Sequence, residues 1–262
     1  MSLIILFGPD GSGKTTLTRG LIRELKKLNY NIVYIRMKSH HLATYLVLRL
    51  LQKLKYIPET SSPRIIDYNL RRIFGKSKMY LLLEFSSIML WYLLFVKLRL
   101  SRNGIVVADR FSPDSIASLH TISKSLPSIY RKILLNLCRK SIAIYVRSEP
   151  HVLLSRKAEE NLSEMYLRYL LVLYDDIARE VALIAKGLLT IDTTSLPKSQ
   201  SIRRVVKFTK RYLLSQCYSG KRTLSALRRM NSESHILTCE GKEHQGIVNS
   251  FVQAIIMFNR CM

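Results

Sequence analysis

The residues best suited to chemistry form a glycine-rich turn near the start of the chain. The run from Gly8 to Thr15, GPDGSGKT, matches the pattern GxxxxGK[ST], which holds the phosphates of a nucleoside triphosphate. Glycines let the backbone curl so that several N–H groups point at one dense cluster of negative charge. Lys14 would then reach the outer phosphates, and the Thr15 hydroxyl would ligate Mg²⁺. The residues expected to contact ATP are Gly8, Asp10, Gly11, Ser12, Gly13, Lys14, Thr15 and Thr16.

The segments on either side of this turn are those that the motif requires. Leu3 to Phe7 form an apolar run typical of a buried strand. A helix is expected from Lys14, and its inward leucines recur at near-helical spacing, at Leu17, Leu21, Leu25 and Leu28. A chance match to a short pattern is the alternative, and this strand-turn-helix setting argues against it.

A second candidate for chemistry is a carboxylate that follows another apolar run, in Asp109-Arg110-Phe111. In a chain with a phosphate-binding turn, this arrangement places Asp109 near the Mg²⁺ and its water ligands. Arg110 would clamp phosphate oxygens bidentately. Without the turn, a salt bridge at the start of a helix would explain an Asp-Arg pair equally well.

Arg36 is a candidate for holding an anionic acceptor. It follows the apolar run from Ile32 to Ile35, and ligands of open parallel sheets bind at the carboxyl ends of the strands. An exposed arginine at a strand end is the alternative.

A basic pair, Arg156-Lys157, lies in a helix expected to open at Pro150. On a mobile helix this pair could swing over the bound phosphates and stabilise charge on the transferred group. The alternative is a solvated face that pairs with Glu159 and Glu160.

The order of these elements predicts an α/β fold with a five-stranded parallel sheet and helices on both faces. Ser141 to Val146 and Leu188 to Asp192 supply the remaining strands. Residues 1–212 would form this domain. Residues 213–262 would form a basic C-terminal extension that packs back on the main domain through an apolar helix.

The chain of 262 residues carries a formal net charge of +24, and 48% of its residues are hydrophobic. This hydrophobic content suffices for a substantial core, and the charge favours anionic partners. From Thr193 to Ser232 the chain has no acidic residue, so this region could bind nucleic acid or an anionic membrane surface. A solvated surface in a generally basic proteome is the alternative, because no named nucleic-acid motif occurs.

The cysteines and the length of the apolar segments limit which classes of protein remain possible. The four cysteines are widely spaced with no CxxC pair, so neither a zinc site nor a disulfide framework is indicated. Reduced thiols, and an N-terminus without a basic leader, predict a cytoplasmic protein. In the apolar segment 79–100, the uncharged stretch from Phe85 to Val96 is shorter than the ~18 residues of a membrane span. We expect a buried core helix there, with peripheral membrane contact as the alternative.

With these motifs in place, residues 1–212 resemble the thymidylate kinase family of P-loop nucleoside-monophosphate kinases. The resemblance rests on four segments, which are Phe7 to Thr16, Asp109-Arg110-Phe111 followed by Ser115, the helix from Pro150 to Lys157, and the Ile191-Asp192 strand end. It implies a P-loop kinase fold, ATP and Mg²⁺ as cofactors, and phosphorylation of dTMP or a related monophosphate in nucleotide biosynthesis. A homodimer is left open.

The resemblance also implies roles for single residues. Asp10 would contact the acceptor sugar, Arg36 and Arg110 would hold the acceptor phosphate, and Arg156 would act as a lid arginine. Because Gly11 stands where some members have an arginine, the lid must supply that charge.

The sequence departs from the family on the acceptor side. Arg36 is followed by Met37-Lys38-Ser39 rather than Glu-Pro-Gly-Gly, and the stretch from Leu83 to Ser87 has no arginine where the family typically has one. Three functions therefore stay open. They are a nucleoside-monophosphate kinase, a kinase of another small acceptor with Asp10 or Asp109 as base, and a nucleotide-dependent protein that binds nucleic acid or anionic membrane.

Overall fold

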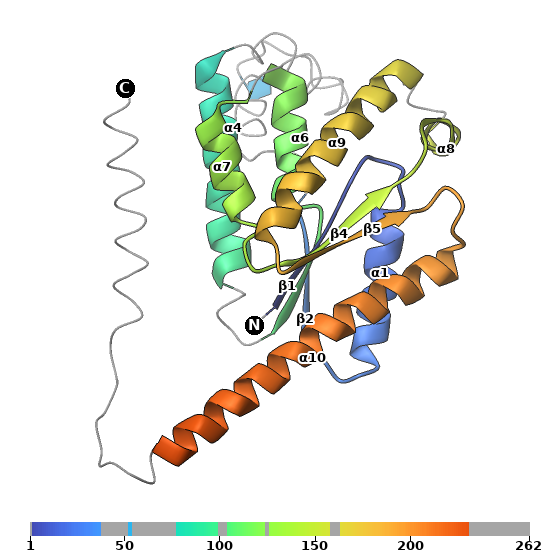
Figure 1. The fold of residues 1–262 in the computed structure, drawn as a ribbon. Helices are drawn as coiled ribbons and strands as arrows, with labels where there is room; N and C mark the ends of the chain where they lie inside the picture. Colours follow the sequence, from blue (N-terminus) through green and yellow to red (C-terminus); the bar gives the residue numbers. More distant parts are fainter. Residues whose placement is uncertain are drawn as a thin grey trace. The chain divides into compact units, whose positions relative to one another are not determined.

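Five parallel strands form one sheet in the spatial order β2-β3-β1-β4-β5 (Figure 1). They are β1 (Ser2–Phe7), β2 (Ile32–Arg36), β3 (Ile105–Asp109), β4 (Ile142–Arg147) and β5 (Gly187–Asp192). The helices are α1 (Lys14–Lys26), α4 (Lys78–Trp91), η1 (Tyr92–Lys97), α6 (Ser112–Ser123), α7 (Ser128–Asn136), α8 (Pro150–Arg156), α9 (Glu164–Ile184) and α10 (Lys198–Met230). The predicted α/β fold, with a five-stranded parallel sheet between two layers of helices, is confirmed.

The computed structural model describes residues 2–37, 52–53, 77–98, 104–123, 126–157 and 163–230, without the side chains of residues 215–230. It divides the chain into two compact units, Met1–Leu214 and Ser215–Met262. The sheet and its helices up to Leu214 belong to the first unit. The expected packing of an apolar helix near the C-terminus lies outside the described residues.

One face of the sheet is covered by α1 and the first half of α10 (Figure 1). Successive strand residues point to opposite faces, and Ile4 and Leu6 of β1 point to this one. Gly20 of α1 lies against Ile202 of α10, where an added Cβ would come within 2.6 Å of the Ile202 side chain. The missing side chain of Gly20 therefore lets the two helices pack closely.

The opposite face is covered by α4, η1, α6, α7 and α9 (Figure 1). Leu3, Ile5 and Phe7 of β1 point to this face, and the ring of Phe7 stacks on that of Tyr145 at a centroid distance of 5.3 Å. Strands with apolar residues on both faces are typical of a parallel sheet between two layers of helices.

The strand register brings the expected functional residues to one edge. Asp109 at the end of β3 has Leu6 of β1 as its partner on one side and Arg36 of β2 on the other. The glycine-rich turn follows β1 directly, so the turn, Asp109 and Arg36 share the carboxyl edge of the sheet.

One expectation about helices was wrong, and one helix was missed. Leu28, expected to point inward, is 45% exposed because α1 ends at Lys26. Helix α6 was not predicted, because its buried surface consists largely of small and polar residues and shows no apolar stripe. These residues include Ser112, Asp114 and Ser115.

The apolar helix α4 continues into η1, which is a π-helix. Among the described residues, one helix, Lys78–Lys97, has the length and the apolar composition needed to cross a membrane. Length and composition alone are weak evidence for a membrane span. Leu81, Phe85 and Ile88 are buried in the core on one side of it, whereas Met79 and Leu90 are exposed.

Gly8 follows β1 directly and lies against the backbone of β4, so it offers a test of the packing between these strands. Its φ is +140°, and an added Cβ would overlap the backbone carbonyl oxygen of Val146. Gly8→Ala should therefore lower the free energy of unfolding by at least about 2 kcal/mol, as measured by urea denaturation.

Gly104→Ala is the control for this substitution, because its Cβ would lie at an ordinary 3.5 Å from the Asn31 carbonyl oxygen. Its cost should stay below about 1 kcal/mol. Equal costs for the two variants would contradict the packing described for Gly8.

Candidate functional site

The glycine-rich turn has the backbone that phosphate binding requires. Gly11 and Gly13 have φ values of +88° and +90°, in the left-handed region that glycine adopts without strain. Gly13 immediately precedes α1, whose first N–H groups and positive dipole end therefore face the turn. Every residue expected to contact ATP lies in this turn or in the first turn of α1.

Lys14 holds its ammonium group inside the turn. Its Nζ donates to the carbonyl oxygens of Gly8 at 2.5 Å and Pro9 at 2.7 Å, and lies 3.4 Å from Asp10 Oδ1. The side chain is only 4% exposed, and this burial lowers the pKa of Lys14, against the opposing effects of Asp114 and Asp10. A cation is thus fixed where the outer phosphates of a nucleotide would lie.

Thr15 and Asp109, the two residues expected to ligate Mg²⁺, lie close together. The Thr15 hydroxyl donates to Asp109 Oδ2 at 2.8 Å, and so does the Tyr34 hydroxyl at 3.2 Å. The other oxygen, Asp109 Oδ1, is buried and has no hydrogen-bond partner among the described residues. These are the hard oxygen donors that Mg²⁺ prefers, and Mg²⁺ is usually bound through one or two carboxylates plus substrate phosphates. The described residues contain no group of three acidic, His or Cys side chains that could hold a metal alone.

Arg36 lies beside Asp109. Its Nε is 3.9 Å from Asp109 Oδ2, and its side chain is 42% exposed. The resemblance implied contact with the acceptor phosphate beside Arg110, yet Met37 rather than Arg36 is among the described residues that line the cavity there.

Arg110 is held toward the turn by its backbone and its charge. Its φ of +68° is unusual for a side-chain-bearing residue, and its N–H donates to the Leu6 carbonyl oxygen at 2.9 Å. Its Nη2 lies 2.5 Å from Asp10 Oδ1. Burial opposes the charge of Arg110, but Asp10 and Asp114 outweigh burial and raise the pKa of Arg110.

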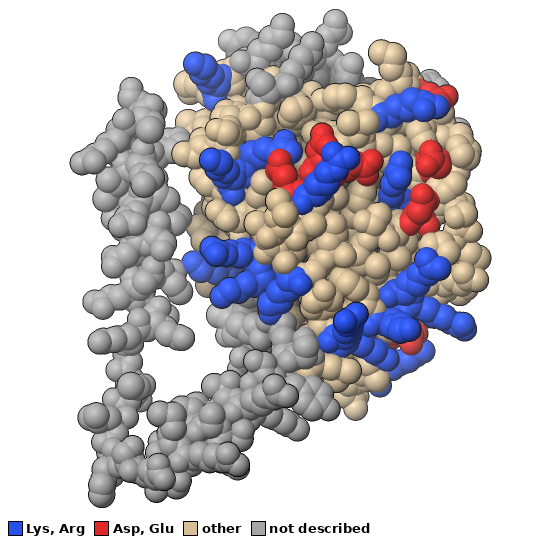
Figure 2. Space-filling model, in the orientation of Figure 1, with Lys and Arg blue, Asp and Glu red and all other residues tan. Residues whose placement is uncertain are grey.

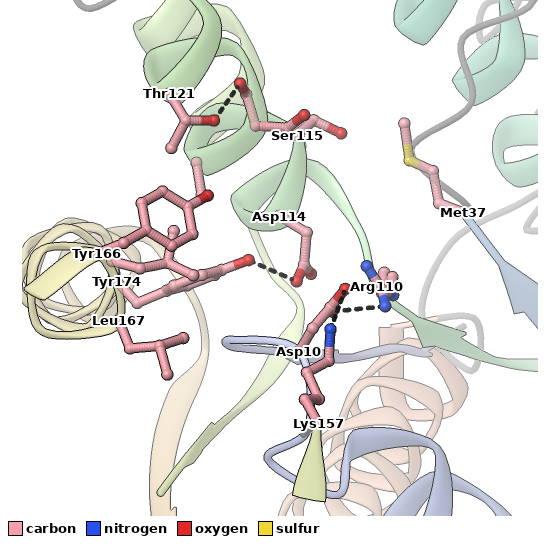
Figure 3. Close-up of a pocket in the computed structure, with 13 residues that line it drawn as sticks. Asp10, Met37, Arg110, Asp114, Ser115, Thr121, Lys157, Tyr166, Leu167 and Tyr174 are labelled. Atoms are coloured by element: carbon pink, nitrogen blue, oxygen red, sulfur yellow. Dashed lines mark hydrogen bonds and ion pairs between the residues drawn. The ribbon is translucent and has the colours of Figure 1, made fainter. Parts of the chain in front are cut away.

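Asp10 is the shared partner of three cations. Its Oδ2 is also 3.7 Å from the Nζ of Lys157, which follows α8 (Figure 3). Burial would raise the pKa of Asp10, but Lys14, Arg110 and Lys157 together lower that pKa to about 2. The carboxylate is therefore ionised at neutral pH and poorly suited to act as a base.

A cavity of about 210 Å³ opens beside this cluster (Figure 3). Asp10, Arg110 and Lys157 form its charged side. Apolar or aromatic side chains such as Tyr166 and Leu170 line the rest together with polar ones, which are Asp114, Ser115, Ser118 and Thr121. Such a cavity suits a molecule with an anionic group at one end and a body that has both apolar surface and hydrogen-bonding groups. We call it the acceptor cavity.

Asp114 in the acceptor cavity was missed by the sequence analysis. Its Oδ1 accepts from the Tyr174 hydroxyl at 3.1 Å and from the Gly8 N–H at 3.4 Å, and its Oδ2 accepts from the Phe111 N–H at 3.2 Å. Burial raises the pKa of Asp114 to about 6 despite the opposing charges of Lys14 and Arg110. The available signal was its position five residues after Asp109, at the start of a helix.

A second cavity, of about 310 Å³, lies on the other side of the turn. Gly11, Ser12, Gly13 and Thr16 of the turn and α1 line it, together with Thr193 and the first turn of α10. Arg156 also lines it, and donates to the carbonyl oxygens of Gly11 and Thr193, each at 3.1 Å. We call it the donor cavity. Arg156 and Lys157 therefore lie at different cavities.

The comparisons with known proteins add little to this geometry. No protein-family model matches the sequence, and no curated protein matches it either. Among solved structures, thymidylate kinase from Ehrlichia chaffeensis is similar to this chain, with 19% sequence identity and a TM-score of 0.47. The similarity covers 79% of this chain and 97% of that one.

The buried carboxyl of Asp114 predicts a pH dependence of stability. Because its pKa is raised from 3.8 to about 6, the folded chain binds its proton more tightly than the unfolded chain does. Its contribution to stability should therefore fall as the pH rises from about 4 to 6, by up to about 3 kcal/mol. The free energy of unfolding of the wild type, minus that of Asp114→Asn, should fall across this window.

Asp176→Asn is the control, because it removes an exposed carboxylate paired only with Arg179 among the described residues. Denaturant titrations at several pH values would measure both differences. A constant difference for Asp114→Asn would contradict the burial of an ionisable group at this position.

Proposed function

We propose that this protein is an ATP- and Mg²⁺-dependent kinase that phosphorylates a nucleoside monophosphate, dTMP or a related one, to the diphosphate. The observation that carries the proposal is the placement of two cavities on either side of one phosphate-binding turn. Asp10 of the turn lines the acceptor cavity, while Gly11 to Gly13 line the donor cavity. A turn shared by two cavities suits transfer of a phosphoryl group between two bound molecules.

On the donor side, the backbone N–H groups of the turn and Lys14 would bind the β- and γ-phosphates of ATP. Thr15 and Asp109 would hold Mg²⁺, which when bound neutralises charge on these phosphates. Arg156, anchored on Gly11 and Thr193, would border the bound nucleotide.

On the acceptor side, Arg110 and Lys157 would orient the phosphate of the acceptor. An oxygen of this phosphate attacks the γ-phosphorus of ATP, the bond from that phosphorus to the bridging oxygen breaks, and ADP leaves. No general base is required because the attacking oxygen is already anionic, so positioning and charge stabilisation account for catalysis. The cytoplasmic location and the homodimer stay predictions.

A second candidate is a kinase that phosphorylates a hydroxyl group, which needs a base. Asp10 is tied to three cations and Asp109 to Thr15, so neither of the two expected carboxylates suits this role. Asp114 favours the candidate, because it is in the acceptor cavity and its pKa of about 6 suits proton transfer near neutral pH. Supplying each acceptor as the nucleoside and as the monophosphate separates the two candidates.

The proposed reaction predicts acceptor-dependent release of ADP. Purified protein with Mg·ATP and a panel of nucleoside monophosphates should release ADP with at least one acceptor. Lys14→Ala should reduce this rate by at least about 100-fold, because it removes a cation from the transferred phosphates.

Lys26→Ala is the matched control, since Lys26 is exposed at the far end of the same helix. Its rate should stay within about twofold of the wild type. ADP release that is the same with and without every acceptor would contradict the proposal.

The separation of Arg156 and Lys157 predicts that their loss impairs the binding of different substrates. Arg156→Ala should raise the KM for ATP by about tenfold or more, because it loses charge-assisted hydrogen bonds beside the donor cavity. Lys157→Ala should raise the KM for the acceptor by a similar factor. Arg168→Ala, at an exposed arginine paired with Glu164, is the control. Steady-state kinetics with each substrate varied in turn would measure both constants, and identical effects of the two lid variants would contradict this division.

A further inference from the structure

A basic groove lies between α1 and the first half of α10, away from the acceptor cavity. It has a volume of about 640 Å³. Arg23 of α1 and Arg203, Lys207 and Lys210 of α10 line it, over a floor that includes Val206. Figure 2 shows blue side chains gathered over this part of the molecule, with little red between them. The groove belongs entirely to the unit Met1–Leu214.

The cations of the groove are short of acidic partners. Glu24 is the acidic residue among those lining it, and it already pairs with Arg23 at 3.6 Å and with Lys27 at 2.9 Å. Arg203, Lys207 and Lys210 form no ion pair within the part of the chain that the structure describes. Nothing in residues 193–232 can offset them, because this stretch contains no acidic residue.

This arrangement works against the stability of α10 itself. Arg203 and Lys207 are four residues apart and Lys207 and Lys210 three apart, and such like-charge neighbours destabilise a helix by about 0.2–0.5 kcal/mol per pair. Lys198 at the start of α10 also faces the positive end of the helix dipole. A helix that keeps this repulsion is suited to an external anion that relieves it.

The shape and the lining of the groove select the class of partner. A concave channel between two helices suits a linear polyanion, whereas a flat membrane surface is bound by helices that also expose large apolar side chains. Among the described side chains of α10, Leu214 is the large exposed one, and it does not line the groove. No aromatic side chain lines the groove either, so its described residues offer no platform for stacking bases.

We propose that this groove binds the phosphate backbone of a nucleic-acid strand without preference for sequence. The first turn of α10 lines both the groove, through Ser199, and the donor cavity, through Lys198. A bound strand would therefore lie next to the nucleotide site, but its binding depends on the groove cations and not on phosphoryl transfer.

The experiment compares two triple variants of the full chain for binding to labelled single-stranded RNA oligonucleotides of two different sequences. Arg203→Glu/Lys207→Glu/Lys210→Glu reverses three groove cations. Lys132→Glu/Arg139→Glu/Lys186→Glu reverses three exposed cations elsewhere, so the change of net charge is the same. Fluorescence anisotropy over a range of salt concentrations gives the affinity and its salt dependence.

The groove variant should bind both sequences at least about tenfold more weakly than the control variant. The slope of log affinity against log salt should fall by about 2, since each phosphate contact on a single strand contributes about 0.7. Arg203→Ala/Lys207→Ala/Lys210→Ala should show the same loss of affinity. Because this variant only removes like charges from one face of α10, it should melt at or above the wild-type temperature.

Three results would overturn the proposal. They are absence of RNA binding by the wild type, equal loss of affinity in the groove and control variants, and binding to vesicles of anionic lipid without binding to RNA at the same salt concentration.

Discussion

The cluster of charges around Asp10 is the interaction on which the candidate site depends. One carboxylate joins three elements that are far apart in the sequence, because it pairs with Lys14 of the turn, Arg110 after β3 and Lys157 after α8. An exposed ion pair contributes little by itself, but three cations around one partly buried carboxylate hold the pKa of Asp10 near 2. Without that anion, the three cations would repel one another around the turn.

Two carboxyl groups in one cavity have opposite electrostatic environments. Asp10 lies among cations with part of its side chain exposed, whereas Asp114 lies 8% exposed beneath the same cations, with a pKa of about 6. Pairs of titratable groups whose pKa values are separated in this way are common at functional sites. The hydrogen bonds from Gly8, Phe111 and Tyr174 to Asp114 also connect the turn, the start of α6 and α9. The same residue is therefore both part of the cavity wall and a link between its elements.

Local patterns were sufficient to predict the turn, the succession of strands along the chain and the approach of Thr15 to Asp109. Each of these depends on a strand and the residues that directly follow it. The expectation that Leu28 points inward was wrong, because periodicity does not show where a helix ends. Asp114 could not be found in this way, since its burial depends on Tyr174, sixty positions later in the chain. The neighbours Arg156 and Lys157 appear equivalent in sequence, and only the path of the chain after α8 separates them between two cavities.

The adjacency of Arg156 and Lys157 has a consequence for the order of events in the proposed reaction. Two consecutive residues move as one rigid piece, so a displacement of α8 that withdraws one cation from its cavity also withdraws the other. In the proposed reaction, the donor and acceptor sides would therefore be coupled through this one short segment. A single substitution that shifts the end of α8 would then disturb both cavities, and not one alone.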